Sequence, residues 1–118
     1  MKFNDIQDPD PLPTYTALVE ALNALKPAYV HVMRAGIGAE TVLRSAFKGT
    51  FLAGGGYLKA EADATLAAGT ADAIVFGSTY LANPDLVTRF EKDAPLNTPD
   101  QATFYTPGPK GYTDYPTI

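Results

Sequence analysis

The segment Ala53-Gly54-Gly55-Gly56-Tyr57 decides how this chain is interpreted, because a short apolar run ends there in three successive glycines. The run Thr50–Ala53 has the composition of a buried strand, and a helical pattern follows the glycines. A second apolar run, Ala71–Phe76, ends in the same way at Gly77-Ser78. When a parallel strand ends in glycine and a helix follows, the backbone N–H groups of the turn can bind an anion. The pattern allows phosphate binding, but on these residues alone a plain strand-to-helix turn is favoured.

The rest of the chain repeats this strand-and-helix unit. Strands are expected to start near residues 28, 50 and 72, about every 22 residues. The helices are expected from Thr14, over 42–47, over 59–68, and from an N-cap at Asn83 followed by Pro84. In the first helix, the apolar positions are expected to form one buried stripe, made of Tyr15, Leu18, Val19, Leu22 and Leu25. This order predicts an α/β fold with parallel strands joined by crossovers.

Three parallel strands are too few for a complete domain. The run Ala28–Met33 is almost continuously apolar, which is typical of a strand covered on both faces. Two open edges on such a sheet favour pairing with another chain. The sequence therefore predicts part of a larger barrel or sheet, with an aromatic tail over 94–118 that packs onto it.

Composition excludes several classes of function. The chain has 118 residues, 46% of them hydrophobic, and a net charge of −4, which argues against a nucleic-acid surface. No apolar run is long enough to predict a membrane span, and Asp5, Asp8 and Asp10 near the N-terminus do not fit a signal peptide. With no cysteine and one histidine, a metal site is not expected, and the cytoplasm is the default location.

Several further segments carry a resemblance to a known family. Together with Ala53–Tyr57, the segments are Lys2-Phe3-Asn4-Asp5, Tyr29-Val30-His31-Val32, Phe76-Gly77-Ser78, Leu81-Ala82-Asn83-Pro84-Asp85-Leu86-Val87, Ala94-Pro95-Leu96-Asn97, Thr103-Phe104-Tyr105 and Gly111-Tyr112-Thr113-Asp114-Tyr115-Pro116. The chain resembles the C-terminal part of the old yellow enzyme family of FMN-dependent ene-reductases, close to the N-ethylmaleimide reductases. The resemblance implies that residues 1–118 are the C-terminal portion of one flavin-binding TIM (β/α)8 barrel, with strands six to eight and the tail.

The resemblance also implies roles for individual residues. Backbone N–H groups at Gly55 and Gly56, and at Gly77 and Ser78, would face the FMN phosphate. Tyr105 would lie beside the flavin and the substrate entrance, together with Phe104. Ser78 departs from the family, which usually has an arginine there, so its hydroxyl can donate a hydrogen bond but brings no charge.

The family's other active-site groups would lie outside this sequence. These are the strand with an Arg-Leu-Ser-Pro segment, the paired histidine and asparagine or two histidines, and the tyrosine that donates a proton. No catalytic residue is therefore expected within 1–118, and the isolated chain is expected to be inactive. The resemblance implies an NAD(P)H-dependent reductase of activated alkenes that works as a split protein, in a heterodimer with a complementary chain holding the first five strands.

Other interpretations stay open at this point. The chain is alternatively a non-catalytic α/β module that binds a phosphate-bearing ligand or flavin, or an inactive fragment that self-associates. His31 is interpreted as a packed or hydrogen-bonded structural histidine rather than a catalytic one. Arg34 either points into the site or is a solvated loop residue.

Overall fold

A computed structural model describes residues 8–34 and 38–118. The segment Lys2–Asp5 and residues 35–37 of the loop after the first strand lie outside this part. The chain divides into two compact units, residues 1–75 and 76–118.

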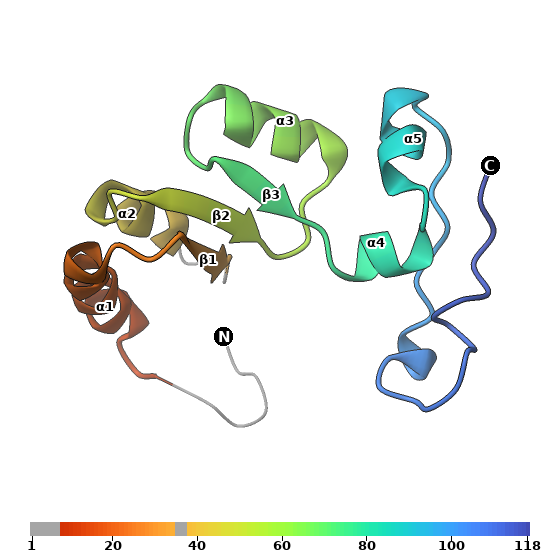
Figure 1. Cartoon of the computed structure of the whole chain (residues 1–118), viewed down its shortest axis with the longest axis horizontal. Coiled ribbons are helices and arrows are strands. Elements are labelled where there is room, and N and C mark those ends of the chain that lie inside the picture. The colour runs from red at the N-terminus through yellow and green to blue at the C-terminus, as the bar shows by residue number, and fades with distance from the viewer. Residues whose placement is uncertain (1–7, 35–37) are drawn as a thin grey trace. The chain divides into compact units, whose positions relative to one another are not determined.

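The first unit alternates helices and strands, as Figure 1 shows. Its elements are α1 (Pro11–Leu25), β1 (Tyr29–Met33), α2 (Ala39–Ala46), β2 (Thr50–Gly54), α3 (Lys59–Ala67) and β3 (Ala73–Val75). The three strands form one parallel sheet in the order β1-β2-β3. The predicted α/β fold with parallel strands is confirmed.

Helix α1 begins at Pro11, earlier than the expected start at Thr14. Proline suits a first helical turn, because its ring fixes a helical φ and the N–H it lacks would have no partner there. The predicted buried stripe is wrong for most of its members. Only Val19 is buried, whereas Tyr15, Leu18 and Leu25 are exposed, because the helix packs mainly against α2.

The two faces of the sheet differ sharply. On one face, Phe51 and Ala53 of the central strand are fully buried. On the other face, Tyr29 is 56% exposed and Met33 is 54% exposed, and His31 between them is exposed too. The expectation that β1 is covered on both faces is wrong for the described residues. Alternation along a strand sends successive side chains to opposite faces, and only one face of β1 carries cover.

Substitution of neighbouring residues in β2 should reveal this asymmetry. We expect Phe51→Ala to lower the free energy of unfolding by about 3–5 kcal/mol, because it opens a cavity under a fully buried ring. Leu52→Ala, on the open face, should cost clearly less. Denaturant unfolding followed by circular dichroism measures both variants. Equal losses would contradict the assignment of the buried face.

The second unit has short helices and an irregular tail. Its elements are α4 (Ser78–Ala82), α5 (Leu86–Glu91) and a 3₁₀ turn, η1 (Gln101–Thr103). The predicted helix start at Asn83-Pro84 is wrong, since α5 begins at Leu86 with Asp85 as its N-cap. The side chain of Asn83 is fully buried and used elsewhere: its amide donates to the Thr79 carbonyl (2.8 Å) and its oxygen accepts from the Asn97 N–H (2.7 Å).

Within the second unit, a buried arginine of α5 joins the tail to this helix. Arg89 donates to the Asp85 carboxylate (2.7 Å) and to the backbone carbonyls of Pro95 and Pro116. The N–H of Ile118 donates to the second oxygen of Asp85 (2.8 Å). The expectation that the tail packs rather than being disordered is confirmed for these contacts.

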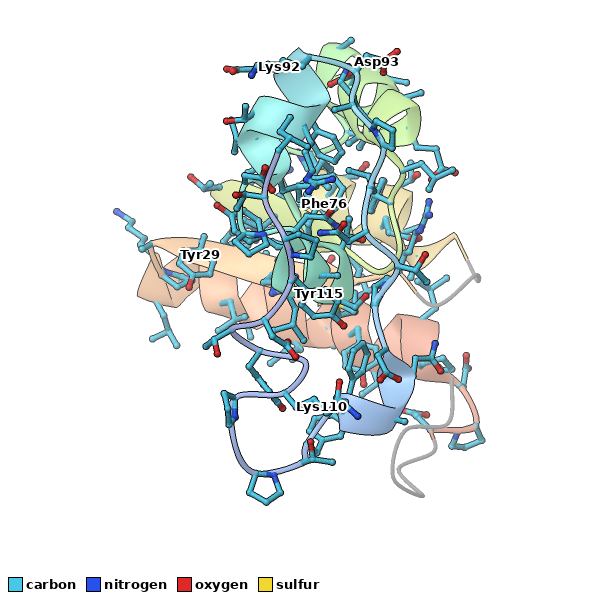
Figure 2. All side chains as sticks on the ribbon, turned by 90° about the vertical axis from the view of Figure 1, so that its right-hand side faces the viewer. Tyr29, Phe76, Lys92, Asp93, Lys110 and Tyr115 are labelled. Carbon is cyan, nitrogen blue, oxygen red and sulfur yellow. The ribbon has the colours of Figure 1, made fainter. Side chains whose placement is uncertain are left out.

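Tyr115, near the end of the tail, is joined to Asp100 near its start. The hydroxyl of Tyr115, labelled in Figure 2, accepts a hydrogen bond from the Asp100 N–H at 2.8 Å. The Asp100 side chain in turn accepts from the Ala102 N–H (3.1 Å) and caps η1. Two distant parts of the tail are therefore joined by hydrogen bonds to backbone groups.

No helix in residues 8–34 and 38–118 is long and apolar enough to cross a membrane.

The closure of the tail should depend on pH. The hydrogen bond from Arg89, followed by that from the Ile118 N–H, lowers the pKa of Asp85. A lowered pKa means that the contact stabilises the folded state above the ordinary aspartate pKa of about 3.9 and is lost as the pH falls through the lower folded value. The Arg89 Nε–H resonance, whose proton is donated to Asp85, should therefore move only below about pH 3.9 when it is followed by NMR as the pH falls.

Asp85→Asn supplies the control for this titration, because the amide cannot ionise. The Arg89 Nε–H resonance of that variant should show no acid transition. A transition in the unsubstituted chain at or above the ordinary aspartate pKa would contradict the assignment.

Candidate functional site

The loop after β2 has a backbone that only glycine adopts easily. Gly55 has φ 105° and Gly56 has φ 74°, both in the region that L side chains rarely occupy. A Cβ on Gly55 would also lie 3.0 Å from the Arg34 backbone nitrogen and 3.1 Å from its oxygen. The glycine run therefore lets the loop pass directly against the residue that follows β1.

Arg34 binds three successive carbonyl groups of this loop. Its backbone N–H donates to the Gly54 oxygen at 2.9 Å. Its side-chain Nε donates to the Gly55 oxygen at 2.7 Å, and Nη2 donates to the Gly56 oxygen at 2.8 Å. One residue thus fixes the orientation of three peptide groups in a row.

The N–H groups of the same peptides point the other way. In a trans peptide the N–H is opposite to the C=O, and no cis bond occurs in the described residues. The N–H groups of Gly55, Gly56 and Tyr57 therefore face away from Arg34. Within residues 8–34 and 38–118, no hydrogen bond uses them. The sequence predicted donors at Gly55 and Gly56, and the geometry adds Tyr57, whereas contact with phosphate stays a prediction.

Arg34 is itself held by its surroundings. Its guanidinium carbon lies 4.1 Å from the centroid of the Tyr57 ring, a cation–π distance, and Tyr57 is buried. Its Nη2 forms an ion pair of 3.0 Å with Glu61 Oε2. The Leu58 N–H donates to the same carboxylate, and this bond, followed by that from Arg34, lowers the pKa of Glu61. The Arg34 side chain is therefore held against the glycine loop, and its interpretation as a solvated loop residue is wrong.

His31 lies close to the glycine run but on the open face of the sheet. A Cβ on Gly54 would meet its Nε2 at 2.7 Å, so the imidazole occupies the space that a side chain at position 54 would need. The register pairs the neighbouring Met33 with Gly54. The interpretation of His31 as a packed histidine does not fit its exposure among the described residues.

Gly77 and Ser78 belong to the second unit. Gly77 has φ −90° and ψ −89°, and its carbonyl accepts from the Leu81 N–H (3.0 Å) in the first turn of α4. Ser78 is the first residue of that helix and is exposed. In the part of the chain that the structure describes, its hydroxyl makes no hydrogen bond. The predicted role of this pair at a phosphate stays a prediction.

Phe104 and Tyr105 are joined in an edge-to-face pair, with ring centroids 6.5 Å apart. Tyr105 has φ 71°, an uncommon value for a residue with a large side chain, and it is 91% exposed. Its backbone N–H donates to the Tyr112 hydroxyl at 2.9 Å. The tail thus presents an aromatic side chain outward from a constrained backbone. The role of both residues beside a flavin is untested.

The chain is similar in sequence to several known reductases. No family model matches the chain. It is 43% identical to a probable flavin mononucleotide-dependent alkene reductase of Leishmania infantum, over 97% of this chain and 33% of that protein. It is 42% identical to 12-oxophytodienoate reductase 1 of Oryza sativa subsp. japonica, over 97% of this chain and 33% of that protein. The chain therefore spans about a third of the length of these relatives.

Solved structures give the same result. Morphinone reductase in complex with tetrahydroNAD matches with a TM-score of 0.87 and 36% identity, over all of this chain and 33% of that chain. The old yellow enzyme of Trypanosoma cruzi matches with a TM-score of 0.86 and 34% identity, over 93% of this chain and 31% of that one. The resemblance to the old yellow enzyme family is confirmed along the chain, and the relatives that it matches include alkene reductases.

Proposed function

We propose that this chain forms the last three β/α units, strands six to eight, and the tail of an FMN-dependent ene-reductase barrel of the old yellow enzyme type. One observation carries the proposal: 97% of the chain aligns at 43% identity with a relative named as an FMN-dependent alkene reductase. The parallel sheet β1-β2-β3 is consistent with consecutive units of such a barrel.

The donors of the β2 loop suit an anionic group such as the FMN phosphate. The N–H groups of Gly55, Gly56 and Tyr57 carry positive partial charge and lie on the side of the loop opposite Arg34. Their number and closeness match the several acceptor oxygens of a phosphate. The chain's contribution here is to bind and orient the cofactor through uncharged backbone groups.

The remaining site residues follow from the resemblance. Gly77 and Ser78 would donate further N–H groups to the phosphate, and Tyr105 and Phe104 would lie beside the flavin and the substrate entrance. Bound FMN supplies hydride chemistry between NAD(P)H and an activated alkene. We assign no catalytic proton donor to residues 1–118, so the isolated chain should not turn over substrate.

A complementary chain holding the first five strands would complete the barrel. The open face of the sheet, with Tyr29 at 56% and Met33 at 54% exposure, is the surface that such a chain would cover. The outer edges of β1 and β3 offer backbone groups for strand pairing. The same open face also supports the second candidate, a non-catalytic module that associates with itself.

Complementation tests the enzyme proposal. The chain alone, with FMN and NADPH or NADH, should not reduce an activated alkene such as N-ethylmaleimide. Addition of a separately produced segment with the first five strands and the loops of a relative should give flavin absorbance that co-elutes with both chains, and turnover. Turnover by the chain alone, or a flavin-free homo-oligomer under both conditions, would contradict it.

Restoring the family's arginine tests the second loop. We expect Ser78→Arg to strengthen FMN binding by about tenfold in the complemented protein, because a guanidinium pairs with phosphate through two charge-assisted hydrogen bonds. Position 78 is exposed, so the fold should tolerate the change. Thr79→Arg, one residue along the helix, is the matched control. Unchanged affinity in Ser78→Arg would remove this loop from the phosphate site.

A further inference from the structure

We propose that Arg34 is the residue that orients the phosphate-binding N–H groups of the β2 loop. The inference rests on the proposed function, but it concerns a residue whose role the sequence left open. Arg34 does not itself reach for the phosphate. It acts from behind the loop, through the carbonyl groups of Gly54, Gly55 and Gly56.

The first step of the argument is the coupling within each peptide group. Turning a carbonyl toward Arg34 turns the N–H of the same planar unit to the opposite side. The flexible backbone of Gly55 and Gly56 has no side chain to enforce this choice, and many other loop conformations are open to it. Three bonds from one arginine select a single conformation in which three consecutive donors are presented outward.

The second step is that the arrangement needs a guanidinium. Nε and Nη2 of Arg34 serve two neighbouring carbonyl oxygens, and Nη2 also serves Glu61. A planar fork with fixed donor directions makes such a set of contacts, whereas a lysine ammonium carries its three donors on one freely rotating nitrogen. The Tyr57 ring and the Glu61 carboxylate keep the fork in place. Lysine would preserve the charge at this position but not the geometry.

A matched control lies at the other end of the same strand. Arg44 donates from Nη1 to the carbonyl of Gly49, which precedes β2, and from Nη2 to Asp72. Its side chain is 27% exposed, close to the 29% of Arg34. It makes the same kinds of bond beside the same strand, but among the described residues no hydrogen bond or ion pair joins it to the Gly54–Tyr57 loop. Its loss should therefore affect stability without affecting phosphate binding.

The experiment compares FMN with riboflavin, which differ only in the terminal phosphate. The ¹⁵N-labelled chain and its variants Arg34→Lys, Arg34→Gln and Arg44→Gln, each complemented with the segment that holds the first five strands, are titrated with each flavin at the same concentrations and followed by NMR. Without ligand, both Arg34 variants should shift the amide resonances of Gly55, Gly56 and Tyr57, and Arg44→Gln should not. Affinity for FMN should fall about tenfold in both Arg34 variants, with riboflavin binding unchanged.

Each outcome decides between distinct explanations. Loss in Arg34→Gln with full affinity in Arg34→Lys would mean that charge alone matters, and it would overturn the positioning role. An FMN preference that survives in both Arg34 variants would overturn the inference and leave the proposed function intact. If the complemented protein without substitutions binds FMN no better than riboflavin, the phosphate loop of the proposed function fails and the inference falls with it. Equal losses in the Arg34 variants and Arg44→Gln would reduce Arg34 to a stabilising residue.

Discussion

The central strand β2 is fixed at both ends by residues from neighbouring segments, and the first unit depends on this. At its start, the Asp72 carboxylate accepts from the Phe51 N–H at 2.7 Å, while the Asp72 N–H donates to the Phe51 carbonyl at 2.8 Å. At its end, Arg34 binds the carbonyls of the glycine run. The strand therefore cannot slide in register, and its last residues emerge in one defined direction. The buried ring of Phe51 adds apolar contact between these two points.

In the second unit, too, an arginine side chain binds backbone carbonyl groups. This unit has little regular structure, so its backbone carbonyls have few partners along a helix or sheet. Arg89 and the amide side chains of Asn83 and Asn97 donate hydrogen bonds to these carbonyl groups instead. Each of the three side chains joins segments that are far apart in sequence. Within the described residues, no buried side-chain nitrogen or oxygen lacks a partner. Such polar bridging makes the tail an ordered part of the molecule.

The features that were predicted correctly from the sequence are those that depend on the spacing of apolar residues and on glycine. The strands, the crossover helices and the turns at Gly55 and Gly77 follow from patterns within a short window. The sequence did not predict that Asn83 would serve Asn97 instead of capping a helix, because the competing partner lies in the distant tail. The open face of β1 was also missed, since an apolar run gives no sign of whether its cover is present. The role of Arg34 depends on the register of two strands, which no local pattern reports.

In the split protein proposed above, a complementary segment and another copy of this chain compete to cover the open face of the sheet. Covering it by a complementary segment is a reaction between unlike partners, whereas covering it by another copy is second order in the chain itself. The second rate grows with the square of the chain's concentration, and the first grows with the product of two concentrations. Which assembly forms is then decided by the rates of synthesis as much as by the relative affinities. Under the proposed function, this chain is therefore best synthesised beside its complementary segment and at a matching rate.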